Sequence, residues 1–253
     1  MPTFDEVVRD AETAPITGWD FSWLAGRATE ERPSWGYTKL LVPRVERVQS
    51  LLDVQTGGGE VLAEVLDRST QVPARIAATE SWAPNAALAR AHLAEYDGDI
   101  AEIADDAEFP FSDTSFELVV SRHPVSTRWD EIARVLSAGG SYFAQHVGPG
   151  SNRELTDFLM GPQPVSKKRS PERAVADATA EGLELVDLRK ATLRVEFFDV
   201  GGVIYFLRKV RWTVPGFTVE KYREQLARLH DQITAEGSFV SHARRFLVEF
   251  RSK

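Results

Sequence analysis

The chain has 253 residues, 43% of them hydrophobic, which is enough for one large core, and no tract rich in proline, glycine or serine divides it. Its formal net charge is −8 and its 30 basic residues are scattered, which argues against nucleic acid as a partner. The absence of cysteine excludes disulfides and thiolate metal sites, and the five histidines show no metal-ligand spacing, so we expect no bound metal.

The amino terminus is acidic and has no apolar segment of the kind found in signal peptides. No apolar run approaches the roughly 20 residues that span a bilayer. We therefore expect a cytoplasmic protein without a membrane partner. The sequence leaves the oligomeric state open.

Residues 51–60, LLDVQTGGGE, indicate a buried strand that ends in Asp53 and continues into a glycine turn. A helix is predicted at 60–66, because its apolar residues share one side. Glycines at such a turn let the backbone approach a flat, polar ligand at the carboxyl edge of a parallel sheet. We expect the function to lie at this turn.

The alternation of strands and helices continues to about residue 148. Alternating elements of this kind predict an α/β fold with a doubly wound, mostly parallel sheet. The predicted strands are 74–80, 99–104, 115–121 and 141–147, and the predicted helices begin near Pro84 and at 131.

The carboxyl half has a different pattern. Residues 170–182 begin with Ser-Pro and end in Gly, as many helices do, and 183–198 resemble a long strand. Thr218 is expected to cap a helix that ends at Gly237. Residues 238–250 form the last predicted strand, which we expect to pair antiparallel with an earlier one.

Acidic residues follow the first three strands: Asp53, Glu80, and the pair Asp105 and Asp106. Because the carboxyl ends of parallel strands meet at one edge, these side chains should converge. Glu80 follows Gly59 at close to the separation of about 20 residues expected of a carboxylate that binds ribose. A nucleoside is the implied ligand.

Two other nucleotide sites do not fit the sequence. A dinucleotide fingerprint would require glycine at position 62, which is Leu62, a side chain that would obstruct a pyrophosphate. A P-loop would require Gly-Lys-Ser or Gly-Lys-Thr after the glycines, and neither follows. A nucleoside without a phosphate chain remains.

Four segments resemble, in order and spacing, the motifs of class I S-adenosylmethionine-dependent methyltransferases. They are LDVQTGGGE, Glu80, DDAEFPFSDTSFELVVS (105–121) and ARVLSAGGSYF (133–143), and the similarity covers about residues 48–148. The resemblance implies one Rossmann-like domain over 1–253, with a seven-stranded sheet whose last strand is antiparallel and follows a helical insertion. It would comprise an amino-terminal helical cap (1–47), a cofactor-binding core (48–148), and substrate-side elements with the last two strands (149–253).

The resemblance also implies S-adenosylmethionine as the cofactor. Positions in the glycine turn would line its methionine part, Glu80 would bind the ribose, and Ser121 would lie near the sulfonium. Asp106, Ala107 and Trp82 would meet the adenine. The implied cofactor-binding residues are therefore Asp53, Gln55, Gly57, Gly59, Glu80, Trp82, Asp106, Ala107 and Ser121.

The sequence departs from the family pattern at two positions. Gln55 stands where the family usually has glycine, so its side chain either crowds the methionine or points away from it. Ala138 stands where proline commonly precedes the two glycines, which only relaxes a turn.

His123 and His146 are the candidate catalytic bases, because both are predicted near strand ends and could take a proton from a hydroxyl acceptor. The acceptor pocket is expected from the aromatic segments 18–37 and 196–217, which suit a lid over a flat apolar molecule. The candidate substrate-binding residues are Trp19, Trp23, Trp35, Tyr37, Arg122, Phe198 and Tyr205.

The function that these patterns favour is methyl transfer to a small-molecule acceptor by in-line displacement. One alternative, motivated by Gln55, is a catalytically silent binding protein with the same fold. Another is an RNA methyltransferase, which the charge of −8 disfavours. A protein acceptor is a further alternative, because an aromatic groove also suits a peptide.

Overall fold

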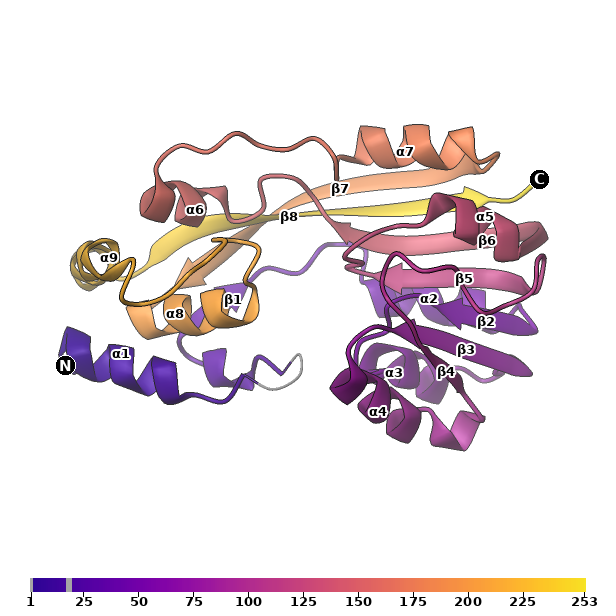
Figure 1. The fold of residues 1–253 in the computed structure, drawn as a ribbon, viewed down its shortest axis with the longest axis horizontal. Coiled ribbons are helices and arrows are strands. Elements are labelled where there is room, and N and C mark those ends of the chain that lie inside the picture. The colour runs from indigo at the N-terminus through magenta and orange to yellow at the C-terminus, as the bar shows by residue number, and fades with distance from the viewer. Residues whose placement is uncertain (1, 17–19) are drawn as a thin grey trace. The chain divides into compact units, whose positions relative to one another are not determined.

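The computed structural model describes residues 2–16 and 20–253, which group into two compact units (Figure 1). Unit 1 consists of Met1–Arg32, Pro149–Ser166 and Thr192–Arg244. Unit 2 consists of Pro33–Gly148, Lys167–Ala191 and Arg245–Lys253. The predicted division into cap, core and substrate-side segments follows chain order, whereas each unit is assembled from three separate segments.

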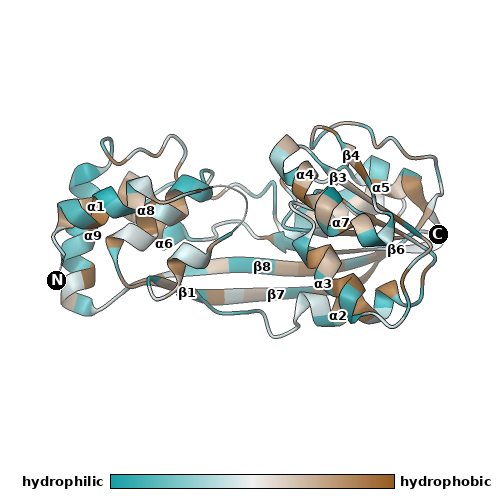
Figure 2. Cartoon of the chain, turned by 90° about the horizontal axis from the view of Figure 1, so that it is seen from below, coloured by the Kyte–Doolittle hydropathy of each residue, from teal (hydrophilic) through white to brown (hydrophobic). Residues whose placement is uncertain are grey.

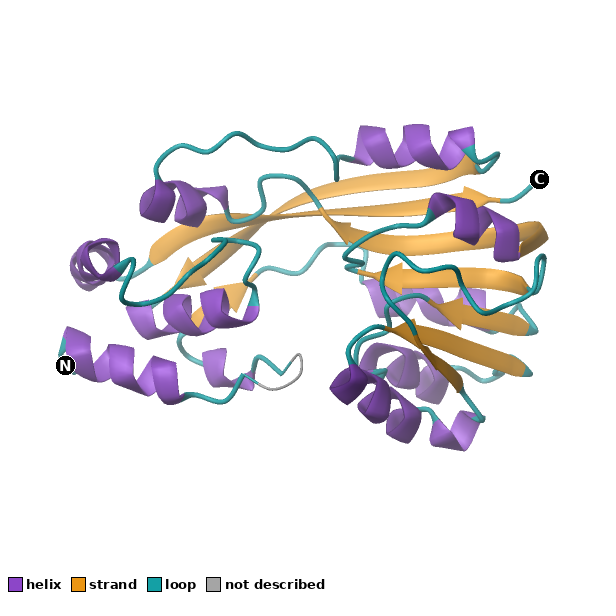
Figure 3. Cartoon of the chain, viewed as in Figure 1, coloured by secondary structure: helices purple, strands orange, loops and turns teal. Residues whose placement is uncertain are grey.

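Unit 2 contains the parallel sheet, drawn as orange arrows in Figure 3. Strand β2 pairs in parallel with β3 and with β5, β3 pairs with β4, and β5 pairs with β6. This confirms the predicted α/β fold with a mostly parallel, doubly wound sheet. The strands are β2 (Ser50–Asp53), β3 (Arg75–Glu80), β4 (Asp99–Glu102), β5 (Phe116–Arg122) and β6 (Leu136–Val147).

Successive residues of a strand point to opposite faces of the sheet, so both faces of this sheet present apolar side chains. Helices cover both of these faces. Leu51 belongs to the core shared with helices α2, α3 and α4, and Leu52 belongs to the core shared with α5 and α7. Figure 2 shows hydrophilic and hydrophobic residues on the same helices, as amphipathic packing requires. The helices are α2 (Tyr37–Val45), α3 (Glu60–Arg68), α4 (Ala83–His92), α5 (Trp129–Val135) and α7 (Pro171–Ala180), with a short 3-10 helix, η2, at Ala94–Tyr96.

The sheet has eight strands in the order β1-β7-β8-β6-β5-β2-β3-β4, not the seven expected. Strand β8 (Phe239–Arg251) pairs antiparallel with β6, as predicted for the last strand, and β7 is Glu184–Phe197. The additional strand is β1 (Ala28–Glu30), which pairs antiparallel with β7. Three residues without an apolar alternation carry no strand signal, so only the pairing partner reveals β1.

In unit 1, α1 packs against α8. Gly201 and Gly202 on α8 permit close approach, because a Cβ on Gly202 would lie 3.0 Å from the carbonyl oxygen of Arg27. Arg27 also forms ion pairs with Asp10 on α1 and with Asp199, the residue that caps α8. The helices of this unit are α1 (Phe4–Thr13), η1 (Ser22–Leu24), α6 (Arg153–Met160), α8 (Val200–Lys209) and α9 (Arg223–Glu236).

The start of α9 differs from the prediction. The Thr218 hydroxyl accepts a hydrogen bond from the Lys221 amide at 3.2 Å, so it caps a turn, and the helix begins five residues later at Arg223. Helices α6 and α8 were not anticipated from the sequence. None of the described helices is long and apolar enough to cross a membrane.

Candidate cofactor site

Strands β2 and β3 are parallel neighbours, and each ends in a buried carboxylate, Asp53 and Glu80 respectively. Both carboxylates therefore lie at the same edge of the sheet, next to the glycine turn. This is the edge where the sequence analysis expected the carboxyl ends of the parallel strands to meet. Burying two acidic groups so close together is costly unless hydrogen bonds or a cation compensate them. The hydrogen-bond partners of the two carboxylates show how much of the cost of burial the protein itself offsets.

Glu80 is held by two backbone amides. The Gly57 amide donates to Glu80 Oε2 at 2.9 Å, and the Trp82 amide donates to Oε1 at 2.9 Å. A carboxylate oxygen has two lone-pair sites, so each oxygen keeps one for a further donor. Glu80 is thus turned into the site and oriented, with acceptor capacity left for the two hydroxyls of a ribose.

Asp53 has one side-chain partner, the Thr56 hydroxyl, which donates to Oδ2 at 2.7 Å. Burial raises the pKa of Asp53 from 3.8 to about 7; the Thr56 hydrogen bond opposes this shift, the charge of Glu80 adds to it, and Arg122 lowers it. Because a carboxylate with a raised pKa is stabilised by a nearby cation, the position favours a positively charged ligand. The ammonium and sulfonium groups of S-adenosylmethionine fit that requirement.

The glycine turn requires glycine at two positions. Gly57 has φ of +68° and Gly59 has φ of +81°, both in the left-handed region that side chains disfavour. A Cβ on Gly59 would also lie 3.1 Å from the Cα of Ala89 on α4. The turn is tied to α4 a second time, because His92 Nδ1 lies 2.7 Å from the Gly58 carbonyl oxygen.

Gln55 adopts the left-handed conformation that glycine would have, with φ of +59°. Its side chain reaches the loop after β5: Nε2 donates to the Ser126 carbonyl oxygen at 2.8 Å, and Oε1 accepts from the Val125 amide at 2.6 Å. Its own amide donates to Thr79 Oγ1 at 3.0 Å. Gln55 therefore strains the backbone at the position where glycine is usual. Its side chain compensates by hydrogen-bonding the turn to the loop after β5.

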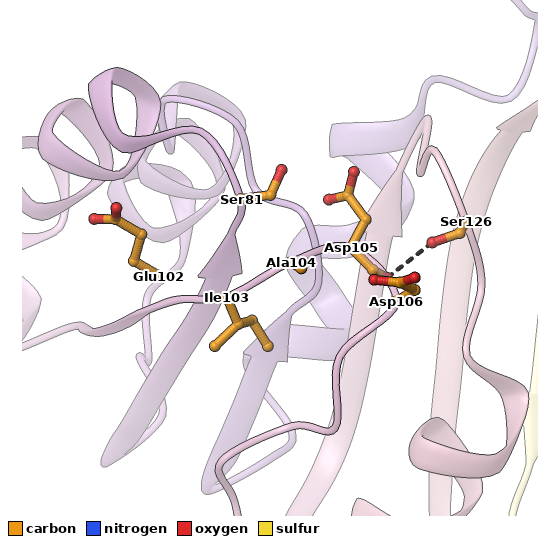
Figure 4. Close-up of a pocket in the computed structure, with 7 residues that line it drawn as sticks. All are labelled: Ser81, Glu102, Ile103, Ala104, Asp105, Asp106 and Ser126. Atoms are coloured by element: carbon orange, nitrogen blue, oxygen red, sulfur yellow. Dashed lines mark hydrogen bonds between the residues drawn. The ribbon is translucent and has the colours of Figure 1, made fainter.

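A surface pocket of about 610 Å³ lies beyond the ends of β3 and β4 (Figure 4). In Figure 4 the side chains of Ser81 and Asp105 point to the same side, and a dashed line joins the Ser126 hydroxyl to the Asp105 backbone, a hydrogen bond of 2.8 Å. The pocket lies next to Glu80 in the chain, because Ser81 is one of its lining residues. Its lining residues are Ser81, Glu102, Ile103, Ala104, Asp105, Asp106 and Ser126.

Of the residues predicted to meet the adenine, Asp106 lines this pocket and Ala107 follows it in the chain. Trp82 is 47% exposed and directly follows Ser81, another lining residue. An exposed indole beside an open pocket could cover one face of a bound ring. These three assignments stay predictions.

Ser121 is buried at the end of β5, where its hydroxyl donates to the Val54 carbonyl oxygen at 2.8 Å. Its own carbonyl oxygen accepts from the Tyr37 hydroxyl at 3.3 Å. The hydroxyl thus joins the ends of β2 and β5 and is already bound to backbone. Its predicted place near the sulfonium stays a prediction.

The two candidate bases have different surroundings. His123 follows β5 with φ of +61° and is half-buried, and its Nε2 lies 2.9 Å from Gln145 Nε2. His146 lies in the core, where its ring stacks on Phe246 with centroids 4.7 Å apart. Burial lowers the pKa of His146 to about 3 and Arg169 lowers it further, so the ring stays neutral. The predicted role of His146 as a base toward the acceptor stays a prediction.

The candidate substrate-binding residues divide between the two units. Trp35 and Tyr37 are buried in the core of unit 2, which argues against their predicted place in a substrate lid, while Arg122 is exposed. In unit 1, Trp23 stacks on Tyr205 with centroids 4.8 Å apart, and both line a pocket of about 350 Å³ with Pro15, Asp20 and Ser22. Phe198 is 39% exposed, and Trp19 lies outside the described residues.

Sequence reasoning missed four residues of the site: Thr56, Thr79, His92 and Gln145. Thr56 had a local signal, because it follows Asp53 by three residues within the turn. The others act through contacts that span more than 20 residues of chain, and the sequence carries no marker for such contacts. Within the described part of the chain, no three His, Asp or Glu side chains gather as a metal site would require.

Comparison with known proteins finds a methyltransferase domain in this chain. Residues 52–144 match a family described as a methyltransferase domain. A curated relative, the 27-O-demethylrifamycin SV methyltransferase of Amycolatopsis mediterranei strain S699, is 30% identical over 127 residues, which is 49% of this chain and 43% of the relative. The aligned part therefore spans less than half the length of that relative.

Two solved structures are similar in fold. The [4+2]-cyclase SpnF has a TM-score of 0.54 and 16% identity, over 99% of this chain and 97% of its own. The phosphoethanolamine N-methyltransferase 2 of Haemonchus contortus, solved with S-adenosylhomocysteine, has a TM-score of 0.51 and 14% identity, over 87% of this chain and 53% of its own. Residues 52–144 of the chain thus match a methyltransferase domain, part of the chain is similar to a curated methyltransferase, and the chain shares the fold of these solved structures.

Proposed function

We propose that this protein binds S-adenosylmethionine and transfers its methyl group to a small-molecule acceptor. The observation that carries the proposal is the pair of buried carboxylates, Asp53 and Glu80, at neighbouring strand ends beside the glycine turn. Glu80 is oriented by two amides with lone pairs to spare, and Asp53 has a pKa that a cation would lower. This combination suits a nucleoside that also carries positive charge.

The chain would bind each part of the cofactor with separate residues. Glu80 would accept hydrogen bonds from the ribose hydroxyls, Asp53 would lie near the methionine ammonium, and the pocket lined by Asp106 would take the adenine. When bound, S-adenosylmethionine supplies an activated methyl group, whose bond to sulfur breaks with the electron pair returning to sulfur. The protein then has to align the acceptor lone pair with the methyl carbon and exclude water.

A small molecule is the acceptor class that the observations favour. The curated relative is named for a small-molecule acceptor, and the charge of −8 on this chain disfavours a polyanion.

A second candidate function is ligand binding, or another reaction, without methyl transfer. A [4+2]-cyclase has the same fold, so the fold does not by itself establish methyl transfer. Gln55, which stands in place of the usual glycine, favours this alternative if its side chain hinders the methionine part of the cofactor.

Calorimetry with S-adenosylmethionine and S-adenosylhomocysteine tests cofactor binding. The wild type should bind both, and Glu80→Gln should weaken binding about ten- to hundredfold, because hydrogen bonds to a charged group contribute about 1.5–3 kcal/mol. Glu64→Gln, on the surface of α3, is the matched control and should bind as the wild type does. Absence of binding by the wild type at millimolar cofactor would refute the proposal.

The acceptor is tested in a separate assay. Transfer of a labelled methyl group to hydroxyl- and amine-bearing small molecules, with 27-O-demethylrifamycin SV among them, should yield a labelled product. Cofactor binding without transfer to any acceptor of the panel would favour the second candidate function.

A further inference from the structure

His123 is held in a strained conformation at the end of β5. Its φ of +61° lies in the left-handed region, which is unfavourable for residues other than glycine. The backbone compensates through the His123 amide, which donates to the Gln145 carbonyl oxygen on β6 at 2.7 Å. The ring is thereby placed against the side chain of the same glutamine.

The Gln145 side chain lies between two rings. Trp35 Nε1 donates to Gln145 Oε1 at 2.8 Å, and Gln145 Nε2 lies 2.9 Å from His123 Nε2. An indole nitrogen can only donate, so the oxygen of the amide must face Trp35 and its NH₂ group must face His123. The orientation of the amide therefore follows from the chemistry of the indole.

This orientation determines which nitrogen of His123 carries the proton. Because Gln145 donates to His123 Nε2, that nitrogen must be unprotonated, and the neutral ring carries its proton on Nδ1. Burial lowers the pKa of His123 well below its usual value, and the charges of Arg245 and Arg122 and the neighbouring His146 lower it further. Protonation at Nε2 would in addition point two N–H groups at each other.

Among residues 2–16 and 20–253, no group accepts a hydrogen bond from His123 Nδ1. We infer that Trp35 and Gln145 are positioning residues that hold His123 as a neutral hydrogen-bond donor through Nδ1, and not as a base. In this last step the inference rests on the proposed function: the acceptor would present an oxygen or nitrogen lone pair to Nδ1–H. Any proton that it loses on methylation would pass to water.

Nitrogen-15 NMR of the histidine rings tests this without cofactor or acceptor. The chain has five histidines, and the His123 signals are identified by their loss in His123→Asn. In the wild type, Nδ1 should appear protonated and Nε2 unprotonated, with no titration between about pH 5 and pH 8. A His123 that titrates in this range, or that carries its proton on Nε2, would overturn the inference.

Gln145→Glu should reverse the tautomer. A carboxylate still accepts from Trp35 but can only accept from His123, so Nε2 should become protonated and the pKa of His123 should rise into the range studied. Gln145→Met removes the donor without adding charge and should leave His123 with both tautomers. A role of Gln145 in packing alone would leave the tautomer unchanged in both variants, and that result would contradict the positioning role.

The proposed function and the inference about His123 are refuted by different results. Absence of S-adenosylmethionine binding would refute the proposed function and leave the tautomer spectrum readable. In an active enzyme, kcat of Gln145→Glu should fall more than tenfold near neutral pH, and its pH profile should gain a limb at the new pKa of His123. Should the variants not fold, the wild-type spectrum alone decides between a donor and a base.

Discussion

The buried Asp53 carboxylate lowers the stability of the ligand-free protein and favours the binding of a cation. Its carboxyl group is buried, has one hydrogen-bond partner and lies near Glu80, so that its pKa is raised from 3.8 to about 7. The ionised form is therefore unfavourable until a cation arrives. A site kept ready for a cation in this way is less stable without its ligand than with it.

Asp53→Asn should make the ligand-free protein more stable. Because the folded pKa is raised, the contribution of Asp53 to stability is complete below about pH 3.8 and is lost as the pH rises towards 7. The gain in free energy of unfolding from the variant should therefore grow between pH 4 and pH 7, reach on the order of 4 kcal/mol, and stay constant above. Urea denaturation at several pH values measures this. A gain for Asp53→Asn that does not depend on pH would contradict the raised pKa of Asp53.

Gln55 permits a matched pair of variants. Gln55→Ala and Gln55→Gly both lose the hydrogen bonds to Val125 and Ser126, but only glycine relieves the left-handed strain. The glycine variant should therefore be about 1 kcal/mol more stable than the alanine variant, measured by chemical denaturation. Equal stabilities would show that position 55 is not strained in solution.

At the scale of elements, helix α4 positions the glycine turn from outside. Ala89 packs against Gly59, and His92 contacts the Gly58 carbonyl oxygen through Nδ1. His92 and Gly58 are 34 residues apart in the chain, and no sequence pattern predicts their contact.

His92→Ala should weaken S-adenosylmethionine binding about fivefold, because one hydrogen bond that orients the turn contributes about 1 kcal/mol. His92→Asn places an amide NH₂ near the position of Nδ1 and should restore most of the affinity. Calorimetry measures both variants. Equal affinities for the wild type and the alanine variant would show that α4 holds the turn through Ala89 alone.

The elements themselves were predicted with uneven success, for identifiable reasons. All five strands of the parallel sheet were predicted, although β4 (DIAE) has only two apolar residues and β6 begins at Leu136, five residues before the predicted start at 141. Helix α8 was missed because VGGVIYFLRK carries two glycines and little polar contrast. The Gly139–Gly140 turn proved to lie within β6, at an irregularity in its pairing with β5.

At the scale of the whole molecule, the charge of −8 leads to a prediction about partners. Nucleic-acid affinity depends on neutralising phosphates with basic residues, and this chain has an excess of acidic ones. Labelled RNA should therefore show no anisotropy change with the protein at low salt, and no methyl label should enter RNA. Binding that weakens steeply with added salt would instead support the RNA methyltransferase alternative.

The sequence alone was enough to predict the parallel sheet, the methyltransferase domain and the edge where Asp53 and Glu80 lie, because apolar periodicity, turn glycines and strand-end carboxylates are local patterns. Only the tertiary structure decided that β1 joins the sheet, that Gln55 reaches the loop after β5, and that His123 faces Gln145 and Trp35. These outcomes depend on residues brought together from distant parts of the chain. The protonation state of a ring, like the pairing of a three-residue strand, is determined by those neighbours and not by the residues beside it in the sequence.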